Sequence, residues 1–136
     1  MRAVVDTNVI AYHLMGAVAL AAEVERFLAA TENLTAPAIW EAELANTLWV
    51  SARAGVLTPG DALEKLSLAS GLGIQSQSTR TLWSGALLRS LDSGVSVYDT
   101  LFVELAEREG VYLATYDRGL LRAFPELARR PGEITP

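Results

Sequence analysis

The sequence predicts an α/β fold, a three-layer α/β/α sandwich with a central, mainly parallel sheet and helices on both faces. Two observations predict it. Short apolar segments alternate with longer segments of helical periodicity, and cap residues, glycine or proline bound most of the helical segments. Because strands separated by helices run parallel and are covered on both faces, the alternation indicates βα units.

Length and composition favour one cytoplasmic domain over residues 1–136. Hydrophobic residues make up 51% of the chain and charged residues 20%, which is enough apolar surface to form a core. The sequence has no cysteine, which excludes disulfides and thiolate metal sites. No signal peptide is visible, and no apolar run approaches the roughly 18 residues of a membrane span, so we expect no membrane contact.

The first half of the chain reads as two strands and three helices. Residues 2–5 form an apolar strand, and Asp6-Thr7-Asn8 is a turn or cap sequence before a helix at 9–14. After Gly16, residues 18–30 have the pattern of an amphipathic helix. A short strand at 34–36 precedes Pro37, which favours the start of a helix at 38–54.

The second half continues the alternation. Thr58 is expected to cap a helix that runs to about residue 70, and the polar break at 71–78 includes a short strand around Ile74. Helices follow at 79–91 and 96–109, then an apolar strand at 111–114. Asp117 opens a final short helix that Pro125 interrupts.

Two of the five aspartates fall where a parallel sheet places its sites. Asp6 and Asp117 follow predicted strands, and ligands bind outside the carboxyl ends of parallel strands. Each aspartate also has a purely structural interpretation, since an aspartate at this place often forms a turn or caps the next helix.

Two further acids project toward predicted core faces. On the helix at 38–54, Glu43 projects within the apolar arc and Glu41 does not, and Asn46 or Thr47 could hydrogen-bond to Glu43. On the helix at 96–109, Asp99 borders the apolar face. The alternative for Asp99 is a capping box with Ser96.

Several acids at one sheet edge point to a divalent cation. Clustered carboxylates repel one another and lose hydration unless a cation joins them. Mg²⁺ or Mn²⁺ suits oxygen ligands, whereas zinc more commonly uses histidine or cysteine, and His13 is the one histidine. His13 is therefore interpreted as an incidental side chain.

Four segments together resemble the acidic motifs of PIN-domain proteins, and the nearest subgroup is the VapC-type toxins of toxin–antitoxin pairs. In order and spacing they are VVDTNVI (4–10), AIWEAELANTL (38–48), VYDTLFVELAEREG (97–110) and LATYDRGL (113–120). The resemblance spans residues 2 to about 127. It implies that the four family acids are Asp6, Glu43, Asp99 and Asp117, with Asn8 and Thr115 as supporting polar residues.

The resemblance also implies a function. It suggests an Mg²⁺- or Mn²⁺-dependent endoribonuclease that hydrolyses tRNA or rRNA, leaving a 5′-phosphate and a 3′-hydroxyl. It further implies a homodimer and a VapB-type antitoxin that covers the site. One departure is Thr100, where alanine is more usual.

The net charge of −5 opposes an RNA substrate, since it disfavours an electrostatic grip on a polyanion. A basic cluster after the fourth acid could attract RNA locally despite the net negative charge. The alternative is that these arginines are ordinary solvated side chains. The members of the cluster are Arg118, Arg122, Arg129 and Arg130, of which Arg118 and Arg122 are the candidate RNA contacts.

Other functions are open at this point. A non-catalytic PIN-like module that binds RNA or protein would retain the acids for structure, and an RNA-processing PIN nuclease could work outside a toxin pair. A phosphatase of the haloacid dehalogenase type needs Asp-x-Asp, but Asn8 stands at the second position. That phosphatase and a receiver domain both need a lysine near a strand end, whereas Lys65 lies in a predicted helix.

Overall fold

The computed structural model describes residues 1–16 and 18–135. Within these residues the central sheet has five strands. Their order is β3-β2-β1-β4-β5, and all four pairings are parallel, where a mainly parallel sheet was predicted. The strands are β1 (Arg2–Val5), β2 (Asn33–Pro37), β3 (Gln75–Gln77), β4 (Leu113–Ala114) and β5 (Ala128–Arg129).

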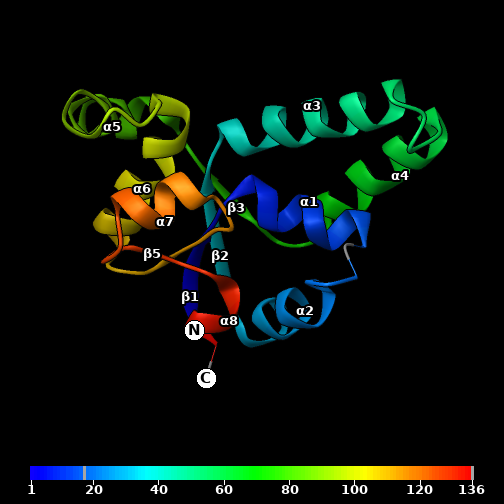
Figure 1. The fold of residues 1–136 in the computed structure, drawn as a ribbon, viewed down its shortest axis with the longest axis horizontal. Coiled ribbons are helices and arrows are strands. Elements are labelled where there is room, and N and C mark those ends of the chain that lie inside the picture. Colours follow the sequence, from blue (N-terminus) through cyan, green and yellow to red (C-terminus); the bar gives the residue numbers. More distant parts are fainter. Residues whose placement is uncertain (17, 136) are drawn as a thin grey trace.

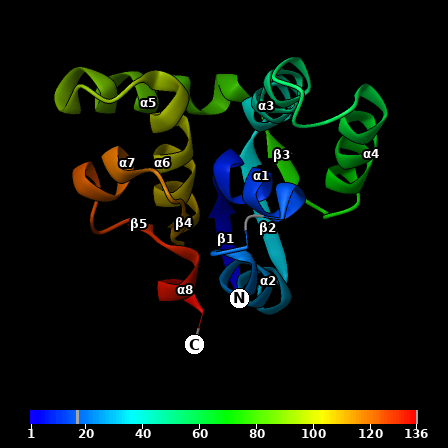
Figure 2. The same ribbon diagram turned by 45° about the vertical axis from the view of Figure 1, so that its right-hand side comes forward.

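Helices cover both faces of the sheet, as predicted. α6 packs on β1, β2 and β4 and carries α5 on its outer side, while α1 lies across the sheet from α6 and packs against α2, α3 and α4 (Figures 1 and 2). The helices are α1 (Thr7–Met15), α2 (Ala21–Ala30), α3 (Ile39–Arg53), α4 (Pro59–Ser70), α5 (Thr79–Ser93), α6 (Val97–Glu109), α7 (Arg118–Ala123) and α8 (Pro131–Ile134).

The core lies between these layers. Val4 and Val5 of β1 are fully buried, as are Phe27 of α2 and Phe102 of α6. Each such side chain contributes about 1.5–3 kcal/mol through burial. β1 is therefore covered on both faces of the sheet, and this packing fixes the position of Asp6, which follows it.

Most predicted elements are present with shifted ends. Thr58 caps α4 with a full capping box. α2 begins at Ala21 rather than at 18, and α1 begins at Thr7 rather than at 9. β4 is shorter than predicted because the N–H of Val111 bonds to the carbonyl of Ala106 and so completes the end of α6.

Two elements at the end of the chain were not predicted. β5 is a two-residue strand and α8 is a single helical turn that begins at Pro131. Both are too short to produce a periodic pattern in the sequence. No described helix is long and apolar enough to cross a membrane.

The strand order creates a switch point between β1 and β4. From β1 the chain adds β2 and β3 on one side and then returns to add β4 and β5 on the other. The connections after β1 and β4 therefore diverge, and they leave a crevice at the carboxyl ends of these strands. Sheets of this kind bind ligands at such a crevice.

Candidate active site

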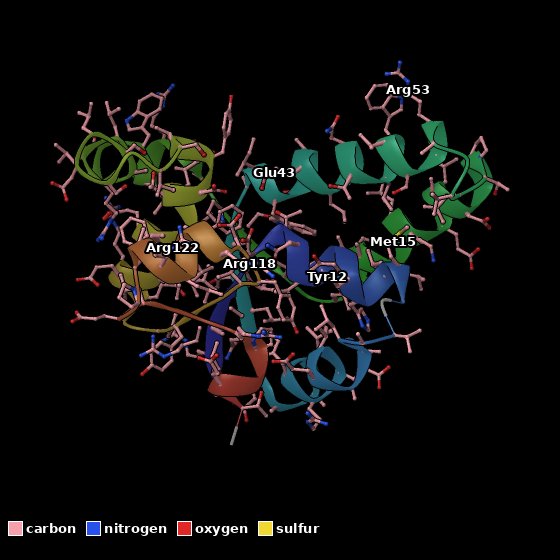
Figure 3. The ribbon with its side chains drawn as sticks, in the orientation of Figure 1. Tyr12, Met15, Glu43, Arg53, Arg118 and Arg122 are labelled. Atoms are coloured by element: carbon pink, nitrogen blue, oxygen red, sulfur yellow. The ribbon has the colours of Figure 1, made fainter. Side chains whose placement is uncertain are left out.

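Four predicted acids line one pocket at this switch point. Asp6 follows β1 and Asp117 follows β4, while Glu43 comes from the first turns of α3 and Asp99 from the first turn of α6. The pocket measures about 350 Å³. Its other lining residues are Thr7, Asn8, Ala11, Tyr12 and Thr47. In Figure 3 Glu43 lies at the left-hand end of α3, with Tyr12 on α1 and Arg118 on α7 below it.

Asp6 is the most buried of the four acids. Burial raises the pKa of this carboxyl from 3.8 to about 7, against the opposing effect of a hydrogen bond from Thr115. The negative charges of Asp99 and Glu43 make smaller contributions to this rise in pKa. Without a cation, Asp6 is therefore partly protonated at neutral pH.

Thr115 links the two strand-end acids through its hydroxyl. Oγ1 donates to Oδ2 of Asp6 at 2.7 Å and accepts from the backbone N–H of Asp117 at 2.9 Å. It also accepts a longer bond from Nδ2 of Asn8 at 3.5 Å. One donor and two acceptor positions are the full capacity of a hydroxyl. The structure thus brings both predicted supporting residues to the acids.

Of the two glutamates in the first turns of α3, only Glu43 lies in the pocket. Glu43 is half-buried in the pocket, whereas Glu41 is exposed and accepts a hydrogen bond from Ser76 at 2.8 Å outside it. Burial raises the pKa of the Glu43 carboxyl, and a hydrogen bond from Thr7 opposes that effect.

The partner of the Glu43 carboxylate was not the one considered from the sequence. Oε1 accepts from Oγ1 of Thr7 at 2.8 Å, while Thr47 donates only to the backbone carbonyl of Glu43 and Asn46 is exposed. Thr7, Ala11 and Tyr12 are the lining residues that sequence reasoning missed. A signal existed for Tyr12, because it lies four residues after Asn8 and so on the same face of α1.

Of the two remaining acids, Asp117 both caps a helix and lines the pocket, whereas the α6 cap is made by Ser96 and not by the Asp99 carboxylate. Oδ1 of Asp117 accepts from the N–H of Leu120 at 2.8 Å and so caps α7. At α6 the described contacts include only half of the expected capping box: Ser96 Oγ accepts from the N–H of Asp99 at 3.4 Å. The carboxyl of Asp99 has its pKa raised by burial and then by the charge of Asp117.

The donor set fits a hard divalent cation. All four acids offer oxygen ligands. The pKa values of Asp6, Glu43 and Asp99 are raised by burial and by a neighbouring acid, and a bound cation would lower them again. Among residues 1–16 and 18–135, no three acidic or histidine side chains already stand close enough together to enclose an ion. His13 does not line the pocket.

The four arginines of the predicted basic cluster have two different kinds of surroundings in the structure. Arg118 and Arg122 are exposed on α7 next to Asp117, and Figure 3 places Arg118 nearer the pocket than Arg122. Arg129 instead lies 5.0 Å from the ring of Tyr112, and Arg130 lies 3.6 Å from Glu23. Only the α7 arginines remain candidates for contact with a ligand in the pocket.

Fold and site together define a class of α/β proteins: an all-parallel sheet with a carboxylate-lined pocket at its switch point. A family model described as "PIN domain" matches residues 3–126, and the chain belongs to this family. The resemblance inferred from the four acidic motifs is thereby confirmed.

Named relatives agree with this assignment. The chain is 34% identical over 131 residues to Ribonuclease VapC3 from Pyrobaculum aerophilum, an alignment that covers 93% of this chain and 98% of the relative. The crystal structure of PAE2754 from the same organism superposes with a TM-score of 0.76 at 22% identity, over 99% of this chain and 93% of that one. The crystal structure of VapBC2 from Rickettsia felis, bound to a DNA fragment from its promoter, superposes with a TM-score of 0.68 at 14% identity. The match covers 96% of this chain and 98% of that one. These two structures support the fold.

Proposed function

We propose that this protein is a metal-dependent endoribonuclease and the toxin of a toxin–antitoxin pair, with residues 1–136 as one PIN domain. The observation that carries the proposal is the convergence of Asp6, Glu43, Asp99 and Asp117 on one pocket at the switch point of the sheet. The 34% identity to Ribonuclease VapC3 supports RNA as the substrate class.

Mg²⁺ or Mn²⁺, when bound, supplies a water of lowered pKa and neutralises charge on the phosphodiester under attack. Asp6, Asp99 and Asp117 would hold the ion, and Glu43 would complete the oxygen set or accept the proton of the attacking water. Thr115 keeps Asp6 oriented through the 2.7 Å hydrogen bond and ties the Asp117 backbone to it. Arg118 and Arg122 would contact RNA phosphates next to the pocket.

The finer parts of the proposal concern substrate and partners. We propose tRNA or rRNA as the target, cleaved to a 5′-phosphate and a 3′-hydroxyl, a VapB-type antitoxin, a homodimer and a cytoplasmic location. Exposed apolar surface supports partner binding. α5 exposes Trp83, Leu88 and Leu91, and α3 with α4 exposes Trp49 and Leu63. Contiguous exposed apolar residues commonly mark contact surfaces.

The test compares two aspartates on neighbouring helices. Mg²⁺ or Mn²⁺ is titrated calorimetrically into metal-free, antitoxin-free protein, and each sample is then incubated with total RNA. We expect the wild type and the Asp92→Asn control to bind metal and to produce discrete fragments, because Asp92 is exposed on α5 outside the pocket. Asp99→Asn should lose both. Folded wild type that neither binds metal nor cleaves RNA would instead identify a non-catalytic module.

A further inference from the structure

The acidic pocket has one aromatic wall that hydrolysis itself does not use. Tyr12 lies on α1, lines the same pocket as the four acids, and is 38% exposed. Figure 3 shows it on α1, with α7 and Arg118 to one side. Exposed tyrosines are common in proteins. Tyr12 differs from most because it lines the acidic pocket and packs against a second aromatic ring.

The Tyr12 ring packs against a second aromatic ring. The centroids of Tyr12 and Tyr116 are 5.3 Å apart and the ring planes are inclined by 78°, an edge-to-face pair. In such a pair Tyr116 can cover at most one face of the Tyr12 ring. Tyr12 also remains 38% exposed and lines the pocket, so a flat ligand in the pocket can reach its side chain.

Tyr116 is itself fixed at both ends. Its hydroxyl donates to Oε2 of Glu23 at 2.9 Å, and its backbone N–H donates to Oδ1 of Asn8 at 3.3 Å. Glu23 also accepts from the N–H of Gly132 at 2.8 Å, and Arg130 lies 5.3 Å from the Tyr116 ring. Because its support is already ordered, Tyr12 loses little freedom when it binds a flat group.

Charge favours a stacking contact at this position. The chain carries a net charge of −5 and the pocket concentrates carboxylates, so electrostatic attraction for an RNA strand is weak outside α7. Stacking on a neutral ring is not opposed by that charge, and every base has a π face. A base in a duplex has both faces covered by its neighbours, so stacking selects unpaired bases.

Resting on the proposed ribonuclease function, we propose that Tyr12 stacks an unpaired base of the RNA strand adjacent to the phosphodiester that enters the acidic pocket. Tyr12 is a substrate-binding residue in this assignment, and Tyr116 with Glu23 positions it.

The test measures stacking directly in a protein that does not cleave. In an Asp99→Asn background, a single-stranded RNA oligonucleotide carrying 2-aminopurine is titrated with the parent, Tyr12→Phe and Tyr12→Leu. Tyr112→Leu is the matched control, since Tyr112 is 44% exposed and precedes β4, at the end opposite the pocket. We expect the parent, Tyr12→Phe and Tyr112→Leu to quench the fluorophore. Tyr12→Leu should bind at least about fivefold more weakly without quenching.

Kinetics with Asp99 intact separate binding from chemistry. Tyr12→Leu should raise KM with little change in kcat, and a duplex of the same sequence should be a poor substrate. Quenching by Tyr12→Leu equal to that of the parent, or loss of quenching in Tyr12→Phe, would overturn the stacking role while leaving the ribonuclease proposal intact. If folded wild type neither binds nor cleaves RNA, the proposed function fails and the stacking role fails with it.

Discussion

Thr7 donates a hydrogen bond from Oγ1 to Oε1 of Glu43 at 2.8 Å and so joins the start of α1 to α3 across the acidic pocket. Thr7 is buried, and Glu43 is half-buried. The hydroxyl orients one carboxylate oxygen without adding a charge to the pocket. Thr47 lines the same pocket but donates only to the backbone carbonyl of Glu43, at 3.0 Å.

Replacing the Thr7 hydroxyl should impair RNA cleavage. Thr7→Val keeps the shape of the side chain but removes the hydrogen bond to Glu43, and hydrogen bonds to charged groups are worth about 1.5–3 kcal/mol. We expect kcat/KM to fall about tenfold or more, measured with a labelled RNA at saturating Mg²⁺. Thr7→Ser restores a hydroxyl and should recover most of the rate.

Thr47→Val is the matched control for Thr7→Val. It removes a hydroxyl from the same pocket but leaves the Glu43 carboxylate untouched. Its rate should stay within about twofold of the wild type. Equal losses in the two variants would refute the positioning role of Thr7.

The metal-free protein should lose stability as the pH rises from about 4 to 7. Burial raises the pKa of folded Asp6 to about 7 from 3.8, so over this range the folded state binds the proton more tightly than the unfolded state. The free energy of unfolding then falls with rising pH, in total by an amount on the order of a few kcal/mol. Urea denaturation in EDTA at several pH values measures this slope.

Asp6→Asn tests the origin of that slope. The variant cannot ionise at this position, so the fall in unfolding free energy between about pH 4 and 7 should become smaller. It should not vanish, because Glu43 and Asp99 also have raised pKa values. A slope identical to that of the wild type would place the titrating group elsewhere.

Divalent metal should stabilise the protein by mass action. An ion that binds the folded state alone adds about 2.7 kcal/mol at a concentration 100 times its Kd, which raises Tm by several degrees. Differential scanning fluorimetry with and without Mg²⁺ at neutral pH measures the shift. The rise should persist in Asp92→Asn and shrink in Asp117→Asn. An equal rise in both variants would mean that the ion binds outside the pocket.

Gly85→Ala should destabilise the contact between α5 and α6. A Cβ at Gly85 would overlap the carboxylate of Glu104, which is buried and lies 3.7 Å from Arg89 and 3.9 Å from Arg108. Displacing a buried, ion-paired carboxylate outweighs the better helix propensity of alanine, and we expect a net loss of about 1–2 kcal/mol.

Gly60→Ala is the control for helix propensity. At Gly60 in α4 the nearest atom to a new Cβ is Thr58 Oγ1 at 3.9 Å, an ordinary contact. This variant should be neutral or more stable by up to about 1 kcal/mol. Chemical denaturation of both variants checks the pair, and a Gly85→Ala protein as stable as the wild type would contradict the overlap.

The order of helices and strands and the four acids were predictable from local pattern. Periodicity separates helix from strand, and cap residues such as Thr58 and Ser96 mark helix starts, because these signals act within a few residues of chain. Asp6 and Asp117 could be singled out since each follows an apolar strand. The short elements β5 and α8 were not predictable, since two to four residues contain no period.

By itself the sequence determined the alternation of helices and strands, the acids that follow the strands and, through four spaced motifs, the PIN-domain family. Only the tertiary structure decided that Thr7 rather than Asn46 or Thr47 bonds to the Glu43 carboxylate, and that Tyr116 supports Tyr12. The physical reason is that these contacts join residues far apart in the chain, and their geometry depends on how the helices pack on the sheet. Local propensity carries no information about such packing.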